Sequence, residues 1–145
     1  MRFRALLATP SDPAILLIRL VVGIVFLSEG VQKFLFPAAL GAGRFAKIGL
    51  PAPEFLGPFV GAFEIGGGML VLLGLVTRLA SVPLLLIMLV AIASTKVELL
   101  ADKGFWGMLH DSRTDWALLL SSLFLLIKGG GKWSADERLM SRAHD

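Results

Sequence analysis

Glu64 is the residue whose position points most directly to chemistry. It lies in the stretch from Phe55 to Leu75, where every other residue is apolar, small or proline. A charge at the centre of a hydrocarbon layer costs at least about 2.5 kcal/mol, so an acid there generally faces a partner, a cavity or a ligand. Two interpretations remain open for Glu64: an ion pair with Arg19 or Lys33 on another helix, or a role in a site. We favour the second.

Glu29 and Lys33 are the polar residues most able to act with Glu64. They are four positions apart in the order that suits a helical ion pair, so they either neutralise each other or serve the same site as Glu64. A carboxylate held in such a place could exchange a proton with a bound ligand. The predicted catalytic residues are therefore Glu64, Glu29 and Lys33, and the predicted cofactor-binding residues are Arg19, Lys33, Glu64, His110 and Trp116.

The elements that must position these residues are four apolar segments. A helix needs about 20 apolar residues to cross the hydrocarbon layer. The segments cover residues 14–36, 55–75, 79–97 and 113–128. They predict an all-α membrane protein, a four-transmembrane-helix antiparallel bundle that makes a single membrane domain over residues 1–145. A short interfacial or re-entrant piece is expected at residues 38–50.

The distribution of Lys and Arg predicts that both termini are cytoplasmic. Longer loops, at residues 37–54 and 97–114, then lie outside. With a rise of about 1.5 Å per residue, Glu29, Lys33 and Glu64 lie about 10, 5 and 14 Å below the outer end of their helices. Arg19 lies near the cytoplasmic side, where long basic side chains often reach the headgroups. Lys96 and the charged residues after it are expected to be solvated in the outer loop.

The composition excludes several classes of protein and site. Of the 145 residues, 56% are hydrophobic and 17% are charged, and the mean hydropathy is +0.80. The net charge of +3 is not gathered into a basic stripe with interleaved aromatics, so no nucleic acid partner is expected. The absence of cysteine excludes disulfides, thiol nucleophiles and iron–sulfur ligation, and with two histidines neither haem nor a metal is expected.

Small and aromatic residues suggest how the helices pack and what they could bind. Gly57, Gly61 and the run Gly66-Gly67-Gly68 would let the second helix approach its neighbours closely. Aromatic residues toward the outer side could stack on a flat ring, although an interfacial belt is the commoner use. These residues are Phe45, Phe55, Phe59, Phe63, Phe105, Trp106 and Trp116.

Several short motifs, taken in order, resemble the DoxX family of small four-helix bacterial membrane proteins. They are Arg19-Leu20 with Gly23 and Phe26, Gly30 with Lys33, IGLP from Ile48 to Pro51, Glu64 with Gly67, Gly74 with Thr77-Arg78, and GGGKWSAD from Gly129 to Asp136. The resemblance implies a multi-pass protein of the bacterial cytoplasmic (inner) membrane with a redox neighbourhood, since relatives include a subunit of thiosulfate:quinone oxidoreductase. It also makes Arg19, Lys33, Glu64 and Arg78 recurring polar positions.

The sequence is consistent with three functions. The first is a quinone-linked subunit or partner of a membrane oxidoreductase system, in which a quinone headgroup lies near Glu64, Glu29 and Lys33 and a protein partner supplies the electrons. The second is a non-catalytic assembly or structural subunit whose buried charges fix helix packing, with a homo-oligomer as one form. The third, a small-solute transporter, is disfavoured because no inverted repeat is evident.

Overall fold

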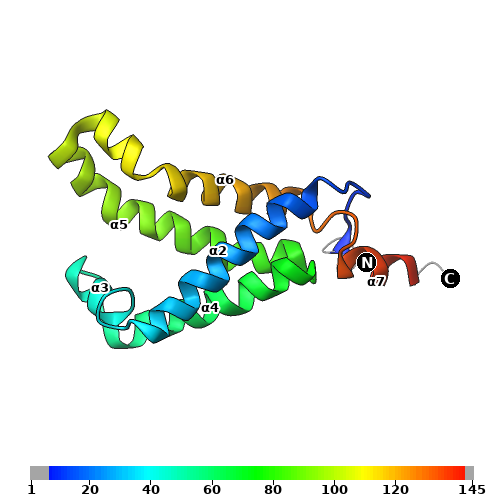
Figure 1. Cartoon of the computed structure of the whole chain (residues 1–145), viewed down its shortest axis with the longest axis horizontal. Helices are drawn as coiled ribbons and strands as arrows, with labels where there is room; N and C mark the ends of the chain where they lie inside the picture. The colour runs from blue at the N-terminus through cyan, green and yellow to red at the C-terminus, as the bar shows by residue number, and fades with distance from the viewer. Residues whose placement is uncertain (1–6, 143–145) are drawn as a thin grey trace.

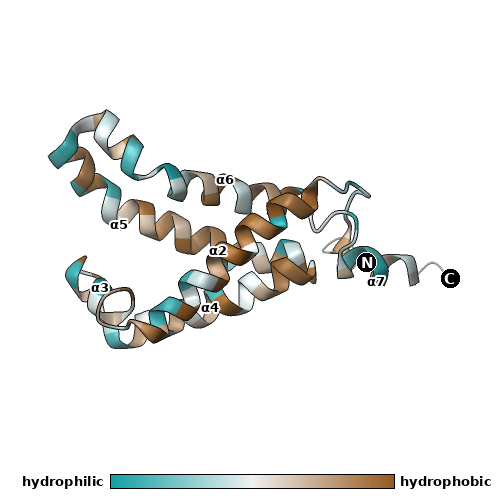
Figure 2. Ribbon diagram, viewed as in Figure 1, coloured by the Kyte–Doolittle hydropathy of each residue, from teal (hydrophilic) through white to brown (hydrophobic). Residues whose placement is uncertain are grey.

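The computed structural model describes residues 7–142, and most of them are helical. The helices are α2 (Ile15–Leu35), α3 (Ala42–Lys47), α4 (Pro53–Leu73), α5 (Thr77–Asp111), α6 (Arg113–Lys128) and α7 (Ala135–Arg142). Hydrophobic residues run along α2, α4 and α5, and hydrophilic ones gather at the tips and on α7 (Figure 2). The described chain is therefore a helical protein with polar ends.

The helices form two hairpins that meet at one end. α2 packs most extensively on α4, and α5 on α6, while the contacts between the pairs are fewer. In Figure 1 the hairpins lie together near α7 and diverge toward α3. We call the end that holds α7 the closed end and the end that holds α3 the open end. A shared core, which includes Val22, Val71, Leu84 and Leu125, joins the hairpins between these ends.

Glycines bring α2 and α4 into backbone contact. A Cβ added at Gly30 would lie 2.7 Å from the carbonyl oxygen of Gly61, and one added at Gly68 would lie 2.8 Å from the backbone nitrogen of Leu27. Backbone atoms cannot move aside as a flexible side chain can. The predicted close approach of the second span is therefore confirmed for these positions, and it fixes how the polar residues of the two helices face each other.

Gly68→Ala is expected to destabilise the protein by about 1–3 kcal/mol, because the added methyl group overpacks a backbone contact. Gly66→Ala is the matched control on the same helix, since a Cβ at Gly66 meets nothing within 4 Å. That control should be neutral or gain up to about 1 kcal/mol from helix propensity. Unfolding of both variants in detergent measures the difference, and equal stabilities would contradict the packing.

Within residues 7–142, three helices are long and apolar enough to cross a membrane: α2, α4 and α5. They coincide with the predicted segments 14–36 and 55–75 and with the beginning of the third. The fourth predicted segment, 113–128, coincides with α6 and has 16 residues, fewer than the other candidates. The protein is thus a helical membrane protein with several apolar helices, and the fourth crossing and the side on which the termini lie stay predictions.

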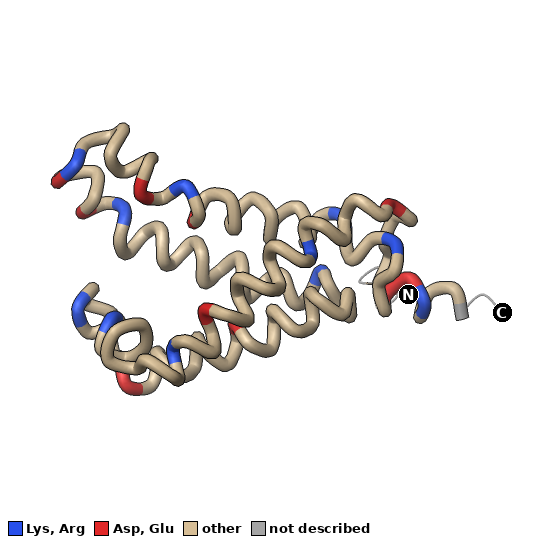
Figure 3. Tube along the Cα trace, in the orientation of Figure 1, with Lys and Arg blue, Asp and Glu red and all other residues tan. Residues whose placement is uncertain are grey.

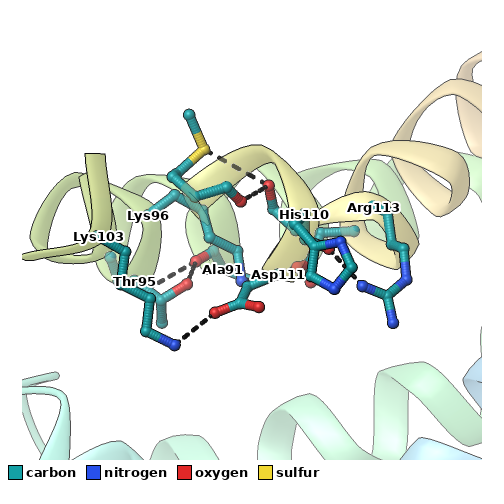
Figure 4. Close-up of polar contacts among 11 residues, drawn as sticks. Ala91, Thr95, Lys96, Lys103, His110, Asp111 and Arg113 are labelled. Carbon is teal, nitrogen blue, oxygen red and sulfur yellow. Dashed lines mark hydrogen bonds and ion pairs between the residues drawn. The ribbon is translucent and has the colours of Figure 1, made fainter. Parts of the chain in front are cut away.

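The predicted outer loop at residues 97–114 is wrong. Helix α5 continues to Asp111, with an interruption at Gly104, where φ is 68° and ψ is 179°. The stretch after Lys96 loses hydropathy but keeps Glu, Leu, Ala and Lys, which favour helix. The charged tip is consequently ordered: Lys103 Nζ lies 2.7 Å from Asp111 Oδ2 across the interruption (Figure 4).

Polar contacts of Arg19 and Asp136 join the helices at the closed end. Arg19 is 2% exposed and donates to the carbonyl oxygens of Val71 at 3.0 Å, Leu72 at 2.5 Å and Gly130 at 3.2 Å. The guanidinium therefore binds carbonyls in the last turn of α4, where a helix has fewer backbone donors for its carbonyls. The expectation that Arg19 reaches the headgroups is wrong for this reason.

Asp136 serves the start of α5 in the same way. Its Oδ1 accepts from the backbone N–H of Val76 at 2.6 Å, and its Oδ2 accepts from the N–H of Thr77 at 2.9 Å and the hydroxyl of Thr77 at 2.8 Å. Val76 has a φ of 45°, a left-handed conformation that is unfavourable for a β-branched residue. The contact between Asp136 and this turn thus helps to hold the strained connection between α4 and α5.

Candidate functional site

The open end of the bundle encloses a cavity of about 630 Å³. Its walls come from α2, α3, α4, α5 and α6, so it lies between the two diverging hairpins. A volume of this size is within the range of small-molecule sites, which are about 300–1,000 Å³. Charged positions gather at the two ends of the bundle, and a few lie along the α2/α4 hairpin (Figure 3). The charges nearest the centre of the bundle at this end line the cavity.

Lys33 and Glu64 form an ion pair across the hairpin. Lys33 Nζ on α2 lies 2.6 Å from Glu64 Oε2 on α4, and their side chains are 10% and 5% exposed. The ammonium approaches Oε2 without the direction of a hydrogen bond, and no other group of residues 7–142 donates one to that oxygen. Of the partners considered from the sequence, the structure selects Lys33 over Arg19. The pair joins α2 to α4 and at the same time lines the cavity.

Glu29 also lines the cavity and is exposed. Within residues 7–142 it forms no ion pair, because Lys33 reaches Glu64 instead. The predicted neutralisation of Glu29 by Lys33 along the helix is therefore wrong. Glu29, Lys33 and Glu64, which we call the inner cluster, together carry a formal charge of −1. The inner cluster has more hydrogen-bond acceptors than the protein itself uses.

A second ion pair closes the opposite wall. Lys96 Nζ on α5 lies 2.7 Å from Asp115 Oδ2 on α6, with side chains 15% and 27% exposed. Both residues line the cavity, as does Arg44 from α3. Lys96 is thus a half-buried helical residue, which corrects its predicted place in a solvated loop.

The rest of the cavity wall is mainly apolar. Phe26 of α2, Phe45 of α3 and Phe59 of α4 contribute aromatic rings, and Met88 of α5 contributes a thioether. Phe45 and Phe59 were among the aromatics for which an interfacial belt was expected and stacking on a ring was the less common alternative. Phe55 and Phe63 instead pack against Phe59 along α4, with ring centroids 5.3 and 4.8 Å apart, and do not line the cavity. The walls suit a flat, uncharged ring.

Some predicted site residues lie elsewhere. Arg19 is at the closed end with its guanidinium bound to carbonyls, so its predicted role beside Glu64 does not fit the geometry. His110 is exposed at the charged tip, where its backbone carbonyl accepts from Arg113 at 2.6 Å (Figure 4). Trp116 is 37% exposed and does not line the cavity, although its neighbour Asp115 does. The structure therefore brings together Glu64, Glu29 and Lys33 and separates the other three from them.

Several residues of the cavity wall carry no signal of ligand binding in the sequence. Met88 and Leu118 are buried apolar residues of α5 and α6, and nothing in an apolar run distinguishes a cavity wall from a core position. The pair of Lys96 and Asp115 could have been found from the polar residues that end one apolar segment and begin the next. Within residues 7–142, no group of three His, Cys, Asp or Glu side chains is placed to hold a metal ion.

Comparison of the sequence with known proteins places the chain in a family. The sequence profile of the DoxX family matches residues 14–97, which include α2 to α4 and most of α5. The chain is 51% identical over 144 residues to "Uncharacterized membrane protein Rv3486" of Mycobacterium tuberculosis, covering 95% of this chain and 88% of that protein. It is 35% identical over 115 residues to "Putative oxidoreductase CatD" of Bacillus subtilis, covering 79% and 78%. No solved structure matches the chain.

Proposed function

The chain belongs to the DoxX family, and we propose from this membership and the cavity that it is a quinone-linked subunit or partner of an oxidoreductase system in the bacterial inner membrane. The observation that supports the proposal best is an apolar, aromatic-walled cavity that ends on the inner cluster. The relative named an oxidoreductase supports the redox part by its name alone. In this proposal α6 is the fourth crossing and both termini are cytoplasmic.

The residues of the cavity fit a quinone headgroup. Phe26, Phe45 and Phe59 offer ring contacts, and the volume of about 630 Å³ accommodates the ring with part of a tail. Lys33 carries three N–H groups, and an ammonium donates well to a ring oxygen. Lys33 Nζ lies 2.6 Å from Glu64 Oε2. Glu29, which has no cation partner in residues 7–142, can hold or release a proton beside that oxygen.

A bound quinone supplies the redox chemistry, since it accepts electrons and protons and becomes a hydroquinone. The protein's own part is to orient the ring, exclude water from it and carry protons. Lys33 and Glu64 hold one edge of the ring in place, and Glu29 connects that edge to the cavity mouth. We infer that the electrons come from a protein partner at the membrane surface.

Ala91→Trp is expected to weaken binding of 2-methyl-1,4-naphthoquinone by at least about tenfold, because the indole would overfill the cavity that Ala91 lines. Ala93→Trp is the matched control, since Ala93 is an exposed residue of the same helix outside the cavity wall. The measurement is equilibrium binding of the radiolabelled quinone to protein in lipid nanodiscs, with empty nanodiscs subtracted. Equal binding by the two variants would contradict the cavity as the site.

A structural subunit is the second candidate, and the ion pair of Lys33 and Glu64 is the observation that favours it. The pair lies beside the glycine contact of Gly30 and Gly61, so it could serve only to align α2 on α4. In that case Glu64→Gln would lower the stability of the protein. At a low temperature, where both proteins stay folded, neither the wild type nor the variant would bind quinone. Quinone binding that Ala91→Trp abolishes would exclude this alternative.

A further inference from the structure

The inner cluster has an excess of hydrogen-bond acceptors over donors. Lys33 brings the ammonium N–H groups, and its Nζ lies 2.6 Å from Glu64 Oε2. Glu29 brings a carboxylate that lines the cavity and has no cation within residues 7–142. Glu64, 4% exposed, adds an oxygen that receives no well-directed hydrogen bond from the same residues. A ligand that only accepts hydrogen bonds would offer no donor to either carboxylate.

The excess of acceptors favours a ligand whose ring oxygen can donate a hydrogen bond. The carbonyl oxygen of a quinone accepts hydrogen bonds and donates none, so it can use Lys33 and meets Glu29 unfavourably. A ring hydroxyl can accept from Lys33 and donate to Glu29 at once. Hydrogen bonds to an ionised acceptor are about twice as strong as those between neutral groups, so the hydroxyl has the advantage.

The opposite wall is consistent with a neutral ligand. Lys96 and Asp115 neutralise each other at 2.7 Å, and the apolar residues Phe26, Met88 and Leu118 also line the cavity. A fully ionised ligand would lose its hydration on entering this apolar space, which costs free energy. A neutral ring that carries a hydroxyl keeps its apolar part against these side chains and its polar group on the inner cluster.

We propose that the cavity selects the hydroxylated, reduced form of its ring ligand, a hydroquinone or other phenol, whose hydroxyl donates to Glu29 and accepts from Lys33. This inference rests on the proposed function, which it deepens by naming the form of the ring that binds best. Glu29 is then the residue that determines specificity, and Lys33 and Glu64 position the ring edge. The protein would hold the reduced ring more tightly than the oxidised one.

The test compares a ring that carries a hydroxyl with the same ring that carries a methoxy group, which cannot donate a hydrogen bond. Wild-type protein in nanodiscs is expected to bind 1-naphthol about tenfold more tightly than 1-methoxynaphthalene, the worth of one hydrogen bond to a charged group. Empty nanodiscs correct for partition into lipid. In Glu29→Gln the preference should fall below about threefold, whereas Glu54→Gln should retain it, because Glu54 is an exposed acid outside the cavity wall. Thermal unfolding of each variant checks that it is folded.

The outcomes separate this inference from the proposed function. Equal binding of the naphthol and its ether by wild type, or a preference that survives Glu29→Gln, would overturn the hydroxyl selection. If 2-methyl-1,4-naphthoquinone still bound in a manner sensitive to Ala91→Trp, the proposed function would stand. If none of the ring compounds bound in the cavity, both proposals would fall.

Discussion

Lys33→Met is expected to lower the free energy of unfolding by about 3–5 kcal/mol, because it leaves the carboxylate of Glu64 buried without its cation. The pair is close, with 2.6 Å between Nζ and Oε2, and nearly buried. Lys33→Met combined with Glu64→Met should recover most of the loss, since an apolar pair of similar volume often replaces a buried ion pair without net destabilisation. Unfolding of single and double variants by heat or by SDS in mixed micelles gives the coupling free energy.

The control for this cycle is Lys96→Met, which breaks the more exposed pair with Asp115. Pairs that are partly open to solvent contribute about 1 kcal/mol or less, so the loss should be clearly smaller. Equal, small losses for Lys33→Met and Lys96→Met would show that the charge of Glu64 is not confined as the structure indicates. A full loss that the double variant does not recover would show that Lys33 acts through contacts other than Glu64.

Arg19→Met is expected to destabilise the protein by about 3 kcal/mol while leaving ring binding unchanged in the fraction that stays folded. The substitution removes the side-chain donors to Val71 and Leu72 at the end of α4 and to Gly130 after α6. The carbonyl of Val71 keeps the backbone N–H of Gly74 at 3.0 Å. Arg19→Met also removes a positive charge near Asp136, which holds the start of α5. Unfolding in detergent measures the stability, and naphthoquinone binding at low temperature measures the site.

Arg78→Met serves as the comparison for Arg19. Arg78 is half-buried at the same end and donates to the carbonyl oxygen of Ala8 at 3.1 Å, so its loss should be about 1 kcal/mol. A loss of ring binding in Arg19→Met at full folding would contradict the assignment of Arg19 to the closed end. It would restore the sequence-based prediction that Arg19 helps to hold a cofactor.

The helices that pack against lipid and each other could be predicted from the sequence because their signal is one-dimensional. A long apolar run bounded by polar residues marks α2, α4 and the first part of α5, and the predicted segment 113–128 has the same bounds as α6. The continuation of α5 beyond Lys96 could not be found in this way. Hydropathy reports where a helix leaves the lipid, whereas helix propensity reports where it ends, and only the latter continues through residues 97–103.

Helix α7 was not predicted, although the sequence held a signal for it. Ser134 precedes Ala135-Asp136-Glu137, and its hydroxyl accepts from the backbone N–H of Glu137 at 3.1 Å, as an N-terminal cap does. The chain before it reads as a glycine-rich tail, because Gly129-Gly130-Gly131 suggests a linker. In the structure Gly130 instead supplies a carbonyl to Arg19. Such contacts between distant segments cannot be read from local patterns.

The residues of the inner cluster could be predicted from the sequence, but their pairing could not. Acids and lysines within apolar runs are rare enough to be noticed singly, so Glu64, Glu29 and Lys33 could be singled out. Which of them pair depends on how α2 and α4 face each other, and that is set by the backbone contacts of Gly30 and Gly68. Arg19 carries the same kind of signal as Lys33, yet the helix places it about 20 Å away along the axis.

The proposed function requires that a ring ligand binds in the cavity of the open end, against the inner cluster. An experimental structure of the protein in nanodiscs with 2-methyl-1,4-naphthoquinone tests it most directly. We expect the ring beside Phe26 and Phe59, with one oxygen about 3 Å from Lys33 Nζ. A ring bound instead in the apolar groove between α4 and α5, beside Leu70 and Leu86, or a cavity filled by side chains at saturating quinone, would contradict the claim.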